Sequence, residues 1–192
     1  MSAVDTDPRV IRTREVVVAA TADLLGEQGF DRLTIESIAE RSGVARSTIY
    51  RNWPTRAELF VEAFEQLCSF PEIPDLGSLT DELRLLGQEL ARGLTSDAWG
   101  QALPSLVGSA THDAELADAQ TTFSQRRRAV VAVAFERAMD RGEIAANVQP
   151  GDLAEQFAAG FFYRRLLRHG PLDDAFIERQ IGAVHRIAGA AG

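Results

Sequence analysis

The residues best suited to chemistry are four arginines in one short window of the chain. Between Arg41 and Ala57 the sequence has Arg41, Arg46, Arg51 and Arg56 but no aspartate or glutamate, so this window carries +4. The net charge of the 192-residue chain is −8, so the remainder carries −12. A cationic window on an acidic chain suits the phosphates of a nucleic acid, because phosphate contacts release counterions. The alternative is a solvated segment that happens to lack acids.

The spacing of apolar residues places these arginines on and around two short helices. Ile35, Ile38 and Ala39 recur at helical spacing after Thr34, which is a favourable N-cap residue. Gly43 can adopt the left-handed conformation that ends many helices. The sequence therefore predicts a first short helix that ends in a tight turn at Gly43.

The second short helix is predicted to leave one side exposed. Val44, Ala45 and Ile49 can pack back onto the apolar stripe of the first helix, and Pro54 brings the segment to an end. A helix, a tight turn and a second helix form a helix-turn-helix, in which the second helix enters the DNA major groove. The side chains that this packing leaves facing outward are Arg46, Ser47, Thr48 and Tyr50.

A longer stretch, residues 19–60, resembles the DNA-binding domain of the tetracycline-repressor (TetR) family. The matching features are an Ala-rich first helix that ends in Gly29-Phe30, Thr34 at the start of the second helix, the turn Ser42-Gly43-Val44, Thr48-Ile49-Tyr50, Trp53, and Thr55-Arg56. The recognition helix of this family often begins with serine, and this chain has Ala45 there. We therefore expect the side-chain cap of that helix to be lost or moved.

The resemblance and the predicted exposed face together select nine residues for DNA contact. Arg46 is the expected base reader, because a guanidinium can bond to guanine O6 and N7 at once; a phosphate contact is its alternative role. Ser47 is small enough to bring the helix close to a base edge. Tyr50 and Trp53 can instead be core aromatics with one hydrated edge. By matching the family's motif, the expected phosphate contacts are Thr34, Thr48, Tyr50, Arg51, Trp53, Thr55 and Arg56.

The rest of the chain also has helical periodicity, so the predicted fold is all-α with about nine helices. We expect a three-helix DNA-binding domain at residues 1–54 and a helical ligand-binding and dimerisation domain at 55–192. A helix at 55–68 connects the two, and residues 70–77, with two prolines and a glycine, are the predicted linker. The other helices are expected at about 10–28, 78–94, 99–107, 113–141, 151–169 and 172–190.

The two C-terminal helices carry more apolar surface than one domain can cover. The resemblance implies that they pair with those of a second copy in a four-helix bundle. Such a homodimer presents two recognition helices to successive major grooves of a palindromic operator. The residues expected at this interface are Phe161, Phe162, Ile177, Ile181 and Val184.

The resemblance also implies that a small-molecule effector binds in a cavity among the fourth to eighth helices. Ordinary core packing is the alternative role for each of the residues chosen to line it. The candidates are Trp99, Leu103, Leu106, Phe123, Phe157 and Phe161.

Other classes of protein find no support in the sequence. It has no Gly-rich phosphate loop, no nucleophile motif and no ligand set at metal spacing, so we expect no enzyme, no metal site and no cofactor. Cys68 is the only cysteine, which fits a reducing cytoplasm. The apolar runs are too short to span a membrane, and the polar N-terminus does not have the pattern of a signal peptide.

The sequence thus predicts a cytoplasmic, homodimeric, ligand-responsive transcription regulator, which in this family is usually a repressor. The alternative is a dimeric helical adaptor or ligand-binding protein that does not recognise an operator.

Overall fold

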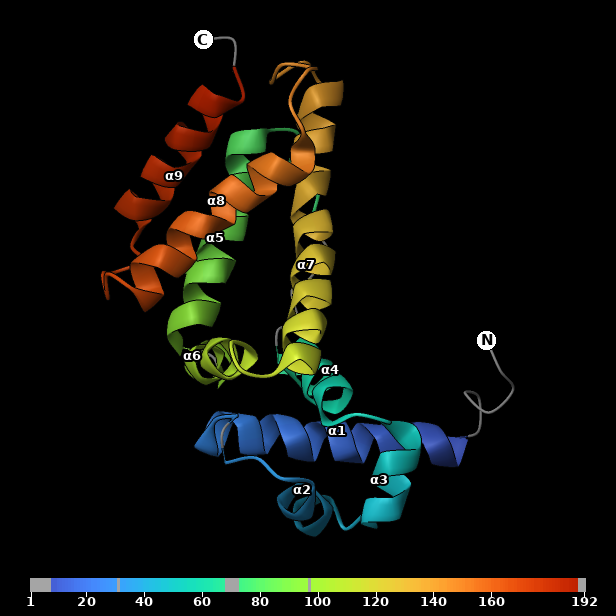
Figure 1. Cartoon of the computed structure of the whole chain (residues 1–192). Coiled ribbons are helices and arrows are strands. Elements are labelled where there is room, and N and C mark those ends of the chain that lie inside the picture. The colour runs from blue at the N-terminus through green and yellow to red at the C-terminus, as the bar shows by residue number, and fades with distance from the viewer. Residues whose placement is uncertain (1–7, 31, 68–72, 97, 190–192) are drawn as a thin grey trace. The chain divides into compact units, whose positions relative to one another are not determined.

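The computed structural model describes residues 8–30, 32–67, 73–96 and 98–189, and these ranges contain helices and no strand. The predicted all-α fold with about nine helices is confirmed. Cys68 and residues 70–72 of the predicted linker lie outside the described ranges. The helices are α1 (Pro8–Gln28), α2 (Ile35–Ser42), α3 (Arg46–Asn52), α4 (Arg56–Leu67), α5 (Leu79–Ser96), α6 (Ala98–Ala110), α7 (Ala114–Asp140), α8 (Pro150–Leu166) and α9 (Asp174–Ile187) (Figure 1).

The helices form two compact units. The first unit holds α1 to α4, α6 and the beginning of α7 as far as Phe123, and the second holds α5, the rest of α7, α8 and α9. These units do not coincide with the predicted division into residues 1–54 and 55–192. The reason is that α1 packs against α4 and α6 as well as against α2.

The first unit is built on α1, and Figure 1 shows α2 and α3 on the same side of that helix. An edge-to-face contact between Phe30 and Phe60, with centroids 4.8 Å apart, joins the end of α1 to α4. Phe64 of α4 makes similar contacts with Trp99 of α6, at 6.1 Å, and with Phe123 of α7, at 5.3 Å. Aromatic packing around α4 therefore ties the helix-turn-helix to α6 and α7 within this unit.

The second unit is closed by the apolar stripes of α8 and α9. Phe161 of α8 lies between Phe157 and Phe176, with ring centroids 5.3 Å and 5.0 Å away. Asp173 caps α9 by accepting a hydrogen bond of 2.8 Å from the backbone N–H of Phe176, so this helix begins slightly later than predicted.

Four of the five residues predicted at a subunit interface belong to the core of the chain itself. Phe161, Ile177, Ile181 and Val184 are all buried within one chain, whereas Phe162 is half-buried. Side chains already buried in one chain have no exposed surface to offer a second copy, so the predicted interface is corrected for these four. The stripe of α9 covers α5 and α8, as the close approach of Ile177 to Gly87 shows.

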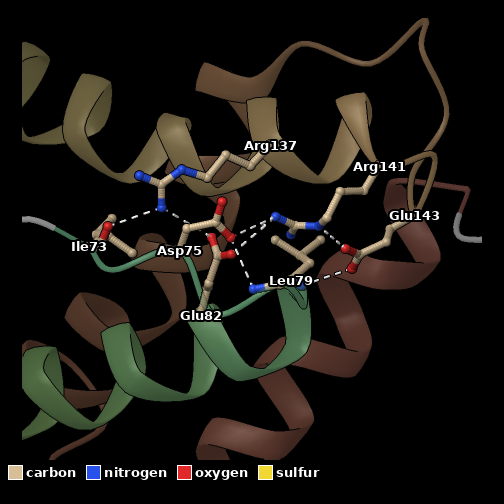
Figure 2. Close-up of polar contacts among 8 residues, drawn as sticks. Ile73, Asp75, Leu79, Glu82, Arg137, Arg141 and Glu143 are labelled. Carbon is tan, nitrogen blue, oxygen red and sulfur yellow. Dashed lines mark hydrogen bonds and ion pairs between the residues drawn. The ribbon is translucent and has the colours of Figure 1, made fainter.

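A buried carboxylate lies near the start of α5. The Glu82 side chain is 0% exposed, and its oxygens lie 3.8 Å from Nη1 of Arg137, in α7, and 3.3 Å from Nη1 of Arg141, which follows this helix directly (Figure 2). Burial raises the pKa of Glu82, and the attraction of Arg141 and Arg137 offsets only part of this effect.

The surrounding polar groups join the segment before α5 to the end of α7. Arg137 donates to the carbonyl oxygen of Ile73 at 3.0 Å, and Arg141 pairs with Asp75 at 3.3 Å. Glu143 pairs with Arg141 and accepts a hydrogen bond of 2.8 Å from the backbone N–H of Leu79, the first residue of α5 (Figure 2). These contacts fix where α5 begins relative to α7.

The packing at Gly87 leads to a test with a matched control. A methyl group at Gly87 would lie 2.7 Å from Ile177 Cγ2 and 3.3 Å from Phe161 Cζ, whereas one at Gly108 would have no neighbour within 4 Å. We expect Gly87→Ala to lower the free energy of unfolding by about 1–3 kcal/mol. Gly108→Ala should raise it by up to about 1 kcal/mol, because glycine is a poor helix former. Urea unfolding measures both, and equal effects would contradict the close packing of α5 against α8 and α9.

The raised pKa of Glu82 predicts how its contribution depends on pH. An acid with a raised pKa contributes stability that is complete below its unfolded pKa, about 4.3 for glutamate, and that is lost as pH rises through the folded pKa. Because glutamine does not ionise, the Glu82→Gln variant does not lose this stability as pH rises. The difference in free energy of unfolding, variant minus wild type, should therefore become more positive as pH rises above about 4.

Glu178→Gln is the control, because a hydrogen bond from Arg84 lowers the pKa of this exposed carboxyl. Its contribution is present above the unfolded pKa and is lost as pH falls, so the corresponding difference should slope the other way. Urea unfolding from pH 3 to 8 covers both windows, since that of Glu178 lies below the unfolded pKa of about 4.3 and that of Glu82 lies above it. The same sign for both slopes would contradict the assignment.

Candidate nucleic-acid interface

Local hydrogen bonds build the turn between α2 and α3. Thr34 Oγ1 accepts a bond of 3.1 Å from the backbone N–H of Ser37, and Ser37 Oγ accepts one of 3.1 Å from the N–H of Thr34. Gly43 has φ 70° and donates its N–H to the carbonyl oxygen of Ala39 at 3.0 Å. The predicted cap and the predicted left-handed turn are both confirmed: the cap begins α2, and the turn at Gly43 ends it and leads the chain into α3.

The predicted recognition helix is α3, and three of the four side chains expected on its outward face, Arg46, Ser47 and Tyr50, are exposed. Ala45 precedes it in an extended conformation with no side-chain capping bond, as the missing serine indicated. Ile49 is the only buried residue of this helix and Thr48 is half-buried. Four side chains of α3 are exposed, and they are Arg46, Ser47, Tyr50 and Arg51.

Two arginines of the cationic window have acidic partners from outside it. Arg46 Nη1 lies 2.8 Å from Glu36 Oε1, and both side chains are more than 60% exposed. Arg41 makes two hydrogen bonds, of 2.9 Å and 2.7 Å, to the carboxylate of Glu27. The bond from Arg46 lowers the pKa of Glu36, so this carboxylate stays charged at neutral pH. Exposed pairs of this kind contribute little free energy, so a nucleic acid can take the place of Glu36.

Trp53 is a core aromatic, the role predicted from the sequence as the alternative to a phosphate contact. Its side chain is 3% exposed, and its indole N–H donates a bond of 2.7 Å to Glu62 Oε2. The guanidinium of Arg14 lies 4.9 Å from the centre of its ring. The N–H group that would have contacted a phosphate is therefore already bonded within the protein.

The remaining predicted contacts divide between exposed and structural positions. Tyr50 is 54% exposed, so it is not a core aromatic. Thr55 accepts a bond of 3.3 Å from the backbone N–H of Glu58 and so caps the start of α4. Arg56 is exposed, and its guanidinium lies over the rings of Phe30 and Phe60. The site thus also involves residues that the sequence reading missed, and these are Arg14, Glu27, Glu36 and Glu62.

The six residues chosen to line a ligand cavity do not fall in one unit. Trp99, Leu103 and Leu106 of α6 are buried in the first unit, where Phe123 of α7 is half-buried. Phe157 and Phe161 are buried in the second unit. In each unit the aromatic contacts described above are those of core packing.

In the described part of the chain, no group of three or more His, Cys, Asp or Glu side chains is arranged to hold a metal ion. Among the residues that the structure describes, none of the helices is both long enough and apolar enough to cross a membrane.

Two protein-family models match successive parts of the chain. The model described as bacterial regulatory proteins of the tetR family matches residues 17–63, which contain α2 and α3. The model for the tetracyclin repressor-like C-terminal domain matches residues 73–184.

Individual relatives match almost the full length. The chain is 31% identical over 173 residues to the uncharacterised HTH-type transcriptional regulator YdeS of Bacillus subtilis, covering 88% of this chain and 86% of the relative. It is 32% identical over 179 residues to a DNA-binding transcriptional repressor TetR of Mycobacteroides abscessus, covering 90% and 92%. Among solved structures, the TetR family transcription regulator SCO0332 superimposes with a TM-score of 0.79 at 29% identity, covering 94% and 99%.

Proposed function

This chain belongs to the TetR family of bacterial regulatory proteins, and we propose that it acts as a homodimer whose two α3 helices read a palindromic operator. It is a DNA-binding transcription regulator and not an enzyme. The proposal adds the DNA contacts, the dimer surface and the response to a small molecule. The proposal places the regulator in the cytoplasm, where the operator DNA of a bacterium lies.

The exposed face of α3 is the observation that carries the proposal. It presents Arg46, Ser47, Tyr50 and Arg51 to solvent on a helix that follows a capped turn. Arg46 reads a guanine once DNA has replaced Glu36, and Arg51 contacts a phosphate. Thr34 and Thr55 lie at the starts of α2 and α4, where free backbone N–H groups favour a phosphate.

The proposed dimer surface is the outer side of α8 and α9, in place of the buried residues first chosen. On α8 the side chains at helical spacing are Ala159, Phe162, Tyr163 and Leu166, and all are exposed or half-buried. On α9 the corresponding side chains are Gln180, Ala183 and Ile187. The two helices approach closely, since a methyl group at Gly160 would lie 2.5 Å from the Gln180 side chain. A two-fold axis beside this pair of helices would bury both stripes.

The proposed response to a small molecule follows from linkage. A ligand that binds better to the conformation unsuited to DNA lowers operator affinity by the ratio of its two affinities. Trp99, Leu103, Leu106 and Phe123 remain the candidates for contact in the first unit. Phe157 and Phe161 remain the candidates in the second, and no cofactor is part of the proposal.

Substitution of the two exposed arginines of α3 separates base reading from phosphate binding. Arg46→Ala should reduce discrimination between operator and random duplex by about 1–3 kcal/mol. Arg51→Ala should weaken binding to both duplexes alike. It should also reduce the slope of log affinity against log salt concentration by about 1. The operator is first identified by mapping bound DNA in the source genome, and titrations at two salt concentrations then measure both effects.

Arg92→Ala, in α5, is the control for loss of one exposed positive charge. It should leave both affinities unchanged. If neither substitution in α3 alters DNA binding, the assignment of α3 is wrong and an adaptor role becomes the better reading.

The dimer surface is tested with substitutions at exposed positions, which the fold of one chain tolerates. Tyr163→Glu and Ile187→Glu should shift the protein from dimer to monomer in sedimentation velocity, because each puts a charge into an apolar contact. Val130→Glu, at an exposed apolar position on α7, is the control and should leave the dimer intact. A dimer unchanged by both substitutions on α8 and α9 would remove these helices from the interface.

A further inference from the structure

One carboxylate oxygen on α4 receives hydrogen bonds from two other segments of the first unit. Glu62 Oε2 accepts a hydrogen bond of 2.7 Å from Trp53 Nε1, at the C-terminal end of α3. It accepts a second, of 2.6 Å, from Arg14 Nη2 of α1. Both donors are strong partners for a carboxylate, and bonds to a charged acceptor are stronger than neutral ones. We call Arg14, Trp53 and Glu62 the Glu62 cluster.

Arg14 makes further contacts that tighten this cluster. Its guanidinium lies 4.9 Å from the centre of the Trp53 ring, and its Nη1 lies 3.5 Å from the carbonyl oxygen of Asn52, the last residue of α3. A cation at the C-terminal end of a helix is favoured by the helix dipole. The end of α3 is therefore bonded to α4 through Glu62 and to α1 through Arg14.

The helix held in this way has few other fixed contacts. It is seven residues long, buries only Ile49 and begins without a side-chain cap. A helix this short is not stable on its own in water, so its neighbours determine both its formation and its direction. A single buried side chain fixes where the helix lies, but it leaves rotation about that point weakly restrained. Contacts at the end of the helix restrain this rotation.

We propose that Glu62 is a positioning residue for DNA recognition, because it holds the C-terminal end of α3 in the orientation that brings the exposed face of that helix onto base edges. The inference rests on the proposed role of α3 as the base-reading helix. Glu62 itself does not contact DNA. It acts through Trp53 and Arg14, and it makes the orientation of α3 depend on α4.

Specific binding depends on this orientation more than nonspecific binding does. Contacts to base edges require a fixed geometry, whereas phosphate contacts depend mainly on charge. Loss of the Glu62 cluster should therefore lower the ratio of operator affinity to random-duplex affinity. A residue that only stabilised the fold would change the unfolding midpoint and leave this ratio unchanged.

The test is Glu62→Asp, which keeps the charge and shortens the side chain so that it reaches neither donor. The matched control is Glu58→Asp, the same change at an exposed carboxylate of the same helix. We expect Glu62→Asp to lower the ratio of the two affinities by at least about tenfold, the factor expected for loss of one of the two hydrogen bonds to this charged group. Glu58→Asp should leave the ratio unchanged. Titrations are made at a temperature at which circular dichroism shows that all variants are folded.

A fluorescence measurement reports on the cluster without DNA. Trp99→Phe leaves Trp53 as the only tryptophan of the chain. In this background Glu62→Asp should shift the Trp53 emission to longer wavelength and increase its quenching by acrylamide, because the end of α3 becomes mobile. Glu58→Asp should change neither.

Arg14→Lys covers the case in which Glu62→Asp fails to fold. It keeps the charge but loses the planar fork that joins Glu62, the Trp53 ring and Asn52. The affinity ratio should fall in the same direction, by a smaller factor.

The outcomes separate the inference from the proposed function. An unchanged ratio in Glu62→Asp, with or without an emission shift, would overturn the positioning role while operator binding by the wild type still stands. A wild type that does not distinguish operator from random duplex would overturn the proposed function of α3, and the positioning role with it.

Discussion

The proposed recognition helix, α3, is too short to hold its own position. Because α3 buries only Ile49, its direction comes from its two ends, the turn at Gly43 and the contacts of Trp53. The turn is fixed by local hydrogen bonds within α2, whereas the Trp53 end is fixed by side chains from α1 and α4. The precision of the proposed DNA-binding surface thus depends on Arg14 and Glu62, which are not among the proposed DNA contacts.

Charge is distributed in keeping with selective binding. The chain carries −8 overall, and two arginines of its cationic window pair with Glu27 and Glu36. Exposed pairs such as these exchange readily for phosphates. They reduce the attraction for any duplex, while the base contacts proposed for α3 would still add to binding at the correct sequence. An arginine that pairs with an acidic side chain in the DNA-free protein therefore favours discrimination between DNA sequences over affinity for DNA in general.

The sequence allowed prediction of features that depend on near neighbours. The cap at Thr34, the turn at Gly43 and the outward face of α3 all follow from residues within one or two helical turns. The apolar stripe of α9 shows the limit, because periodicity indicates that a face is buried but does not identify what covers it. Ile181 and Val184 were therefore assigned to a second subunit when they pack within one chain. The Arg14–Glu62 pair is 48 positions apart, and no local pattern indicates such a contact.

The position of α4 connects the two proposals. Glu62 and Phe64 lie two residues apart on this helix, and Phe64 contacts Trp99 and Phe123, two of the residues proposed to meet a ligand. A ligand that repacked these rings would change the rotation or tilt of α4, since a helix of this length moves nearly as a rigid rod. The carboxylate of Glu62 would move with it, and the end of α3 would lose or shift its bonds. On this reasoning the first unit can couple a ligand to DNA without a long relay, because one helix contacts both groups of residues.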